Sequence, residues 1–127
     1  MAVGMRKGVI YNDLGLPFSK WLPTDKFDYV LETEGIKGGD HIKEYKFHET
    51  RGWAFDHAWP SCMVAVEIDG FGYGHQAQQC MAEDNEKANA AIELGWKVLR
   101  YNSRQLGSKA GLSEAVEQVC RVLCGAV

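Results

Sequence analysis

The stretch VAVEIDGFGYGH, residues 64–75, decides the fold that this sequence predicts. It begins as an apolar, valine-rich run of the kind that forms a buried strand, and Gly70 interrupts that run. Glu67 and Asp69 stand at the end of the run, and the alternation of a strand places both on one face of a sheet. The sequence therefore predicts a buried strand over residues 62–69 that ends on two carboxylates.

Two more strands are predicted upstream of this one, IKEYKFH at residues 42–48 and WAFDHAW at residues 53–59. Short turns at residues 50–52 and 60–61 separate the three strands, so we expect an antiparallel meander. Residues 53–59 alternate clearly, which predicts that every second side chain faces the same way. One predicted face holds Trp53, Phe55, His57 and Trp59, and the other holds Ala54, Asp56 and Ala58.

Helical periodicity predicts three helices around these strands. The first runs from an N-cap at Thr24 to a stop at Gly35, and the last begins at an N-cap at Ser113. The middle helix, from about residue 74 to residue 94, carries an inward stripe at Ala77, Cys80, Met81, Asp84, Ala88, Ala91 and Ile92. Residues 96–101, WKVLRY, follow it as a strand. We expect this strand to run parallel to residues 62–69, because a helix of crossover length separates the two.

The predicted fold is therefore α/β (α+β), with a mixed central sheet flanked by helices in the order helix, three strands, helix, strand, helix. The length of 127 residues is that of one domain. We assign the domain to residues 24–127, because the glycines and prolines of residues 1–23 predict an irregular N-terminal arm. Phe18, Trp21 and Leu22 indicate that this arm packs on its own domain or on a second copy of the chain.

The composition is that of an ordinary globular protein, with 46% hydrophobic residues, 24% charged residues and a net charge of -3. A nucleic-acid partner would therefore be attracted by a local patch, or by metal ions held by acids, and not by overall basic charge. The N-terminus lacks the pattern of a signal peptide, and no apolar run has the length of a membrane helix. We expect a cytoplasmic protein without a membrane partner. Its four cysteines are expected to be reduced, and a disulfide framework is the less favoured alternative.

Three acids converge on the predicted scaffold. If residues 53–59 and 62–69 form a hairpin, Asp56 lies toward the same end of the sheet as Glu67, with Asp69 close by. Clustered carboxylates repel one another unless a cation compensates them, and ligands that are all oxygen favour a hard ion such as Mg²⁺ or Mn²⁺. Such an ion polarises a phosphoryl oxygen and lowers the pKa of a bound water. The acids therefore predict a metal site suited to phosphodiester hydrolysis.

The middle helix adds two charged residues to this hypothesis. Asp84 falls on the otherwise apolar stripe, and Lys87 follows one turn later, so both are placed to point back toward the acids. Lys87 would then stabilise charge on the phosphate or orient the attacking water. Simpler interpretations stay open: Asp84 and Lys87 as an ordinary helical ion pair, and Asp69 as a turn residue before Gly70.

On these residues the chain resembles the PD-(D/E)XK nuclease superfamily, and more closely its small phage and bacterial endonucleases, which include very-short-patch-repair-like and Holliday-junction-resolvase-like members. The resemblance rests on the order of the elements and on three segments: HIKEYKFHETRGWAFDHAWP (41–60), VAVEIDG (64–70) and EDNEKANAAIELGWKVLR (83–100). It covers about residues 24–105. The short acidic signature is weakly specific, whereas the extended run with its GW-V-L-R strand is much more specific.

By this resemblance, Asp56 and Glu67 are metal ligands, and the backbone carbonyl of Ile68 supplies a further one. An acid on the first helix is also typical of the superfamily. Asp25 matches it best and would be a further metal ligand, with Glu32 and Glu34 as alternatives.

Two positions matter for the general base and for phosphate contact. Asp69 stands where the superfamily usually has a lysine, although some members have an acid there, so Asp69 is kept as a candidate ligand and catalytic residue. Lys87 is the candidate substitute for that lysine. His75 is similar to a histidine that follows the glycine-rich loop in relatives, where it would contact phosphate or act as a general acid.

The resemblance implies a Mg²⁺-dependent (or Mn²⁺-dependent) DNA endonuclease of a bacterial or phage-infected cell. The small size favours a structure-selective enzyme, such as a Holliday junction resolvase, that acts on branched or duplex DNA. Symmetric cutting of a junction implies a homodimer. One alternative is a catalytically impaired nuclease fold that serves as a nucleic-acid-binding subunit, and a weaker one is a repair or restriction-type endonuclease.

Overall fold

The computed structural model of the protein describes residues 3–36, 39–69 and 77–125. Its main sheet has four strands in the order β3 (Ile42–Lys46), β4 (Ala54–Trp59), β5 (Val64–Asp69) and β6 (Lys97–Asn102). The pairs β3–β4 and β4–β5 are antiparallel, and β5–β6 is parallel. The predicted meander and the predicted parallel crossover are therefore both confirmed, and the fold is a mixed α/β one.

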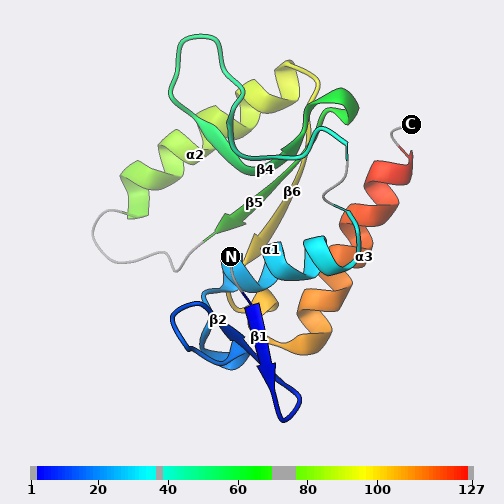
Figure 1. Ribbon diagram of the computed structural model, residues 1–127. Helices are drawn as coiled ribbons and strands as arrows, with labels where there is room; N and C mark the ends of the chain where they lie inside the picture. The colour runs from blue at the N-terminus through cyan, green and yellow to red at the C-terminus, as the bar shows by residue number, and fades with distance from the viewer. Residues whose placement is uncertain (1–2, 37–38, 70–76, 126–127) are drawn as a thin grey trace.

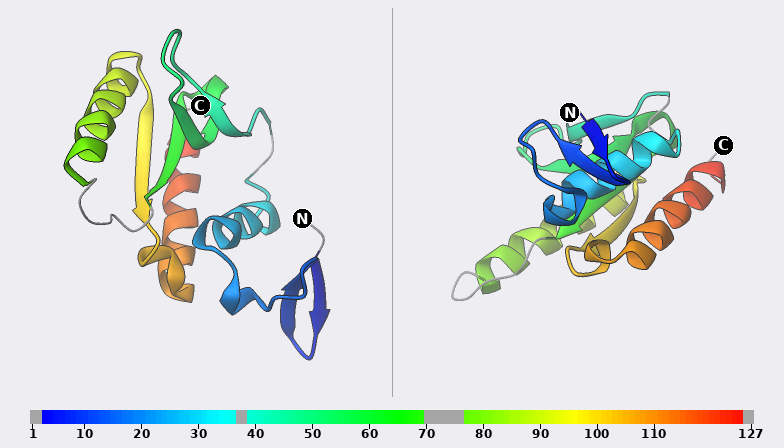
Figure 2. Two further views of the ribbon diagram at one scale, coloured as in Figure 1. Left: turned by 90° about the vertical axis from the view of Figure 1, so that its left-hand side faces the viewer. Right: turned by 60° about the horizontal axis from the view of Figure 1, so that its bottom comes forward.

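Among the described residues, three α-helices cover the two faces of this sheet (Figures 1 and 2). Helices α1 (Pro23–Thr33) and α3 (Lys109–Gly125) pack on one face, where Phe27 and Leu31 of α1 and Val119 of α3 are fully buried. Helix α2 (Ala77–Glu93) covers the other face, where Ala91 packs into a smaller apolar cluster with Phe55. The sheet is thus the middle of three layers. The carboxyl ends of β5 and β6 lie at the same end of the molecule (Figure 1).

The central strand β5 is buried between these layers. Val64 and Val66 belong to the core beneath α1 and α3, whereas Ala65 faces α2, and all three are 0% exposed. Burial on both faces is typical of a central strand with a parallel neighbour. The same alternation carries Glu67 and Asp69 to the α2 side of the sheet.

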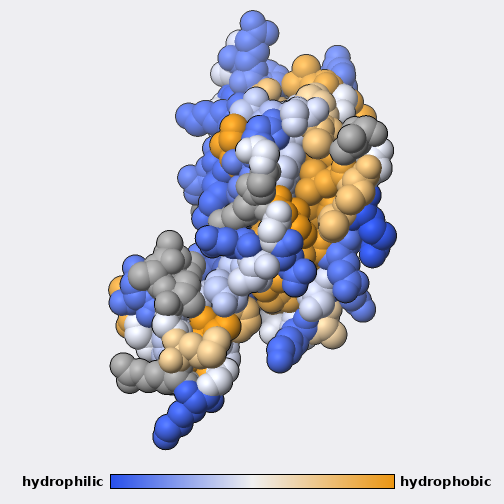
Figure 3. All heavy atoms as spheres, turned by 45° about the vertical axis from the view of Figure 1, so that its right-hand side comes forward, coloured by the Kyte–Doolittle hydropathy of each residue, from blue (hydrophilic) through white to orange (hydrophobic). Residues whose placement is uncertain are grey.

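The irregular arm expected over residues 1–23 is wrong in part. Strands β1 (Val3–Arg6) and β2 (Val9–Asn12) form an antiparallel hairpin, which appears as a small lobe beside the main body in Figure 3. Its two-residue turn has positive φ at Lys7 (49°) and Gly8 (78°), and two-residue turns with positive φ at both positions suit the right-handed twist of hairpin strands. A Lys-Gly pair is a weaker turn signal than Asn-Gly, so the hairpin was not predicted.

Aromatic residues tie this N-terminal segment to its own domain. The Trp21 ring lies 5.5 Å from the Tyr29 ring of α1, and the Phe18 ring lies 4.9 Å from the Trp21 ring. The Trp21 indole N–H donates to Leu16 O at 2.9 Å. Of the three residues expected to pack, Phe18 and Trp21 do so, whereas Leu22 is 65% exposed.

Two predicted N-caps are also wrong. Helix α1 begins at Pro23, with Leu22 at the N-cap position, because proline fits the first turn, where no amide donor is needed. Helix α3 begins at Lys109. There the Ser108 Oγ accepts from Gly111 N at 3.0 Å, which is the contact that an N-cap serine makes. Ser113 lies inside α3.

The described cysteines Cys62, Cys120 and Cys124 are free thiols, as expected. Within the described residues, no helix is both long enough and apolar enough to cross a membrane. Seen with the α3 side turned forward, hydrophilic side chains flank a band of hydrophobic ones (Figure 3).

Candidate active site

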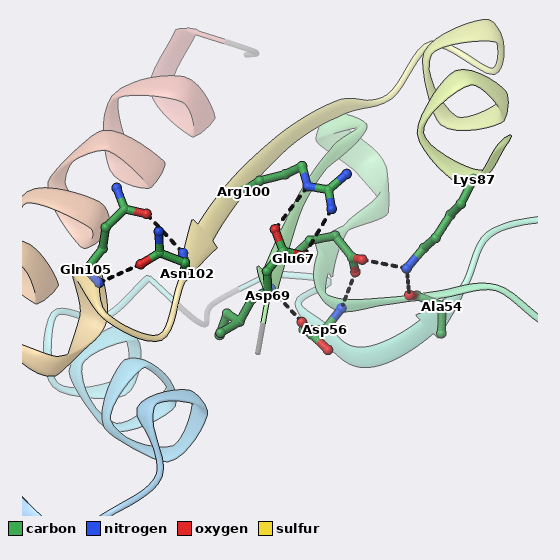
Figure 4. A network of polar contacts seen from close by, with 9 residues as sticks. Ala54, Asp56, Glu67, Asp69, Lys87, Arg100, Asn102 and Gln105 are labelled. Carbon is green, nitrogen blue, oxygen red and sulfur yellow. Dashed lines mark hydrogen bonds and ion pairs between the residues drawn. The ribbon is translucent and has the colours of Figure 1, made fainter. Parts of the chain in front are cut away.

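The candidate site lies where β4 and β5 stop pairing. The register runs from Trp59 opposite Val64 to His57 opposite Val66, and the next two residues along are Asp56 and Glu67. Here side chains replace the backbone ladder. Asp56 N donates to Glu67 Oε1 at 3.1 Å, and Ile68 N donates to Asp56 Oδ2 at 2.6 Å (Figure 4). Each carboxylate therefore satisfies a backbone N–H of the other strand, and the two acids are held side by side.

A local irregularity of β4 accompanies this exchange. Lys43 pairs with His57 and Tyr45 pairs with Phe55, which places Glu44 opposite Asp56, and Glu44 has a φ of 51°. The predicted alternation of β4 fails at this point. Phe55 packs beneath α2, whereas His57 packs on Phe27 of α1 on the other face. The four aromatic residues of 53–59 therefore do not share one face, because the alternation is broken between Phe55 and His57.

Lys87 of α2 reaches the acid pair, Asp56 and Glu67, from the α2 side of the sheet. Its Nζ lies 2.5 Å from Glu67 Oε2 and 2.6 Å from Ala54 O, so it contacts both strands at the point where they separate (Figure 4). The side chains of Lys87 and Glu67 are only 17% and 15% exposed. The sequence prediction that Lys87 points toward the acids is confirmed.

Burial raises the pKa of Glu67 above its ordinary value of 4.5. The hydrogen bond and the charge of Lys87 lower this pKa, and the nearby charge of Asp56 raises it again. Burial prevails, so the ionised form of Glu67 is less favourable here than in water. A perturbed carboxylate with a specific charge partner beside a pocket is a typical feature of functional sites.

Asp69 makes a different pairing. Arg100 of β6 lies opposite Glu67 in the parallel register, and its guanidinium binds Asp69 through Nε to Oδ2 at 3.3 Å and a second nitrogen to Oδ1 at 3.0 Å (Figure 4). The hydrogen bonds that Arg100 donates to Asp69 raise the pKa of Arg100 above its ordinary range, and the charges of Asp84 and Glu67 add to this effect. The charge of Asp69 is therefore neutralised by Arg100 of the neighbouring strand, and Asp69 does not form part of the acid pair of Asp56 and Glu67.

The remaining predicted residues lie as follows. Asp84 is exposed and lines a pocket together with Lys87 and Arg100. Asp25 lies in the first turn of α1, which packs on the sheet face away from α2. His75 lies outside the described residues. Of the predicted inward stripe of α2, Ala91 is buried, but Ile92 is 70% exposed, so the stripe is narrower than expected.

The backbone carbonyl of Ile68 points in a direction that would allow it to be a metal ligand beside Asp56. Asp69 O accepts from Ser103 N on the β6 side, whereas Ile68 N donates to Asp56 on the β4 side. In an extended strand, the N–H and C=O of one residue point to the same side. The Ile68 carbonyl therefore faces the gap between β4 and β5, as Asp56 does.

The donor set fits a hard divalent cation with few protein ligands. Within the described part of the chain, no three His, Cys, Asp or Glu side chains gather closely enough to hold a metal ion, so the predicted acids do not form one cluster. Mg²⁺, however, keeps several waters and is usually bound by one or two carboxylates together with substrate phosphates. Asp56 and Glu67 supply two carboxylates, and the direction of the Ile68 carbonyl allows a third oxygen.

Two site residues were missed by sequence reasoning. Arg100 belongs to the predicted strand 96–101, and a parallel pairing with residues 62–69 brings it to the face of Glu67 and Asp69. An arginine inside the otherwise apolar run VLRY was the available signal. Ala54 contributes only its backbone carbonyl, which no residue type could indicate.

Comparisons of the chain with protein-family models, with curated proteins and with solved structures found no match. The function is therefore argued from the site itself.

Proposed function

We propose that this protein is a metal-dependent endonuclease that hydrolyses DNA phosphodiester bonds, with a preference for branched DNA such as a Holliday junction. One observation carries the proposal: Asp56 and Glu67 are held together at the end of the β4–β5 ladder, and Lys87 contacts the same point. Two carboxylates and one ammonium in a partly buried position are costly to assemble for stability alone. They suit a reaction in which carboxylates hold a metal ion and a cation offsets the negative charge that develops on a phosphate.

Asp56 and Glu67 are the residues that would hold Mg²⁺ or Mn²⁺, with the Ile68 carbonyl as a further ligand. A bound divalent ion supplies Lewis acidity toward a phosphoryl oxygen and lowers the pKa of a water. The backbone bonds of Asp56 and Ile68 keep the two carboxylates in place before any ligand arrives. The site is in this sense preorganised by its own strands.

Lys87 and Arg100 supply positive charge around the acids. Lys87 offsets the charge of Glu67 and, where a phosphodiester binds, offsets the charge that develops on it. Arg100, which is 40% exposed, presents a guanidinium to solvent beside Asp69 and is suited to a phosphate contact. Both cations are set on regular elements, α2 and β6, so their positions are well defined.

Cleavage assays with four-way junction, duplex and single-stranded DNA in the presence of Mg²⁺ or Mn²⁺ test this proposal. We expect cleavage by the native protein, and a loss of about 10³-fold or more in Asp56→Asn and Glu67→Gln, as is common when a group that acts directly on the reacting centre is removed. Glu93→Gln, an exposed change at the end of α2, is the matched control and should cleave normally. Equal activity of all four proteins would refute the site.

The second candidate is a nuclease-like subunit that binds nucleic acid without cutting it. One observation favours it: Lys87 donates to Glu67 Oε2 and Arg100 donates to Asp69, so two of the three acids already have cationic partners. Calorimetric titration with Mg²⁺ separates the two candidates. Heat of binding that is lost in Asp56→Asn supports the enzyme, whereas DNA binding without any response to divalent ions supports the subunit.

A further inference from the structure

A small pocket adjoins the acid pair on the α2 side of the sheet. It has a volume of about 140 Å³ and lies between α2 and the strands β4, β5 and β6. Its apolar wall is formed by Phe55, Ala88, Ala91 and Val98. Glu67 and Lys87 line the pocket as well, so it opens beside the contacts that define the candidate active site.

The apolar wall of the pocket is closely packed. Phe55 is 1% exposed, and its ring is stacked on the Phe47 ring with centroids 4.0 Å apart and planes 6° from parallel. The Trp96 ring supports Phe55 from a centroid distance of 5.0 Å. Ala88 and Ala91 line the α2 side, and their small side chains leave the space open. The pocket is therefore formed by packing that is present before any ligand binds.

The volume suits a single aromatic ring. An apolar protein cavity of about 150 Å³ holds one benzene molecule, so a pocket of 140 Å³ takes one six-membered ring and is small for a fused pair. Ala88 and Val98 are partly exposed and supply the apolar surface on which such a ring packs, whereas Phe55 and Ala91 are buried.

The rim of the pocket is polar and carries both hydrogen-bond donors and acceptors. Arg100 offers guanidinium N–H groups, and Asp84 offers carboxylate oxygens. A phosphate is a poor occupant, because it would lie on an apolar wall beside two carboxylates. A heterocyclic ring with carbonyl oxygens and N–H groups on its edge matches both the wall and the rim.

We propose that this pocket receives one unpaired pyrimidine base of a DNA strand whose backbone lies at the acid pair. The inference rests on the proposed function, since it names the form of DNA that the same site takes. An unpaired base needs little or no unpairing energy to leave the duplex, and enzymes that read extruded bases do so by packing and by hydrogen bonds to the base edge. Preference for branched or bulged DNA then follows from the pocket.

Binding measurements on three short DNA duplexes test the proposal. One is fully paired, one carries a single unpaired thymine, and one carries a single unpaired adenine. Asp56→Asn is the protein used, since Asp56 does not line the pocket and the change blocks cleavage under the proposed function. We expect the thymine duplex to bind at least about fivefold more tightly than the paired duplex, which is the effect of removing about 40 Å² of apolar surface from water. The adenine duplex should bind less tightly than the thymine duplex.

Filling the pocket should remove this preference. Ala88→Leu in the same background is expected to weaken binding of the thymine duplex about tenfold, as one or more extra methylene groups do in a ligand pocket. Ala88→Val, a smaller change, should weaken it less and keeps the test valid if the leucine variant unfolds. Ala82→Leu makes the same change at an exposed position of α2 and should have no effect.

Two results would overturn the proposal: equal affinity for the three duplexes, or a thymine preference that survives both changes at Ala88. Failure of the proposed function is seen separately, as absence of cleavage of any DNA by the native protein. The binding preference and its loss on filling the pocket are measured without cleavage, so the two failures are distinguishable.

Discussion

The carboxylates of Asp56 and Glu67 accept hydrogen bonds from backbone N–H groups, in place of the backbone bonds that β4 and β5 would otherwise form there. Asp56 N donates to Glu67 Oε1, and Ile68 N donates to Asp56 Oδ2. The same two side chains thus have a structural role and a candidate catalytic one. A substitution that tests chemistry without disturbing the fold must therefore preserve these hydrogen-bond acceptors.

Asp56→Ala should destabilise the fold more than Asp56→Asn. Alanine leaves the Ile68 N–H without its acceptor at a partly buried position, and such a loss costs about 1–3 kcal/mol. Asparagine keeps an oxygen there and should cost less than about 1 kcal/mol. Chemical denaturation of the two variants measures the difference. Equal stability would mean that the Asp56 carboxylate does not hold β5.

Lys87→Met should lower the free energy of unfolding by about 3 kcal/mol, because it leaves the largely buried carboxylate of Glu67 without its cation. Lys97→Met, at an exposed position of β6, is the control and should change stability by less than about 0.5 kcal/mol.

The double variant Lys87→Met with Glu67→Gln completes this cycle. Removing the uncompensated charge should restore at least half of the stability lost in Lys87→Met. Strict additivity of the two single changes would contradict a coupled pair.

Glu67→Gln should change the pH dependence of stability. The pKa of Glu67 is raised in the folded protein, so the folded state binds this proton more tightly than the unfolded state. The contribution of Glu67 to stability is therefore fully present below the ordinary value of 4.5 and falls as pH rises through the raised folded value. The variant lacks this fall, so its stability relative to the native protein should increase over that window. Urea denaturation at a series of pH values measures the trend, and a trend of opposite sign would contradict the raised pKa.

Asp69→Asn should have only a small effect on stability. Asp69 and Arg100 are 43% and 40% exposed, and exposed ion pairs are worth at most about 1 kcal/mol because water and salt screen them. The same applies to Arg100→Gln. Thermal unfolding at low and high salt checks both variants, which should differ least from the native protein at high salt. A loss of several kcal/mol would mean that this pair holds β5 and β6 together.

Much of the fold was predictable because local patterns and packing agree. The valines of β5 mark a strand buried on both faces, and Gly95, with a φ of 94°, ends α2 where the helical period ends. Prediction failed where the backbone departs from a regular period. Phe55 and His57 of β4 lie on opposite faces, and Glu44, opposite Asp56 in the neighbouring strand, has a positive φ without a distinctive sequence signal. The hairpin β1–β2 closes through Lys7 and Gly8, a pair that does not strongly favour a turn.

The site was predictable to the extent that strand alternation and helical spacing determine the direction in which a side chain points. They placed Glu67 on the α2 face and pointed Lys87 toward it, and both expectations hold. They could not distinguish Asp69 as a metal ligand from Asp69 as an ion-pair partner. That difference depends on Arg100, whose position requires the register of β5 against β6. Tertiary pairing, and not local sequence, thus decides which acids share a site.

Mg²⁺ should stabilise the native protein through Asp56 and Glu67 and not through Asp69. An ion that binds only the folded state adds about 1.4 kcal/mol when its concentration is ten times the dissociation constant, which corresponds to roughly 5 °C in melting temperature for a chain of this size. We expect this shift in the native protein and in Asp69→Asn, its loss in Asp56→Asn, and its reversal by a chelator. The Asp56 variant is informative because asparagine keeps the bond to Ile68, so a lost response reports ligation and not misfolding. A shift that is lost in Asp69→Asn but retained in Asp56→Asn would move the metal site toward Arg100 and would contradict the assignment made from the β4–β5 junction.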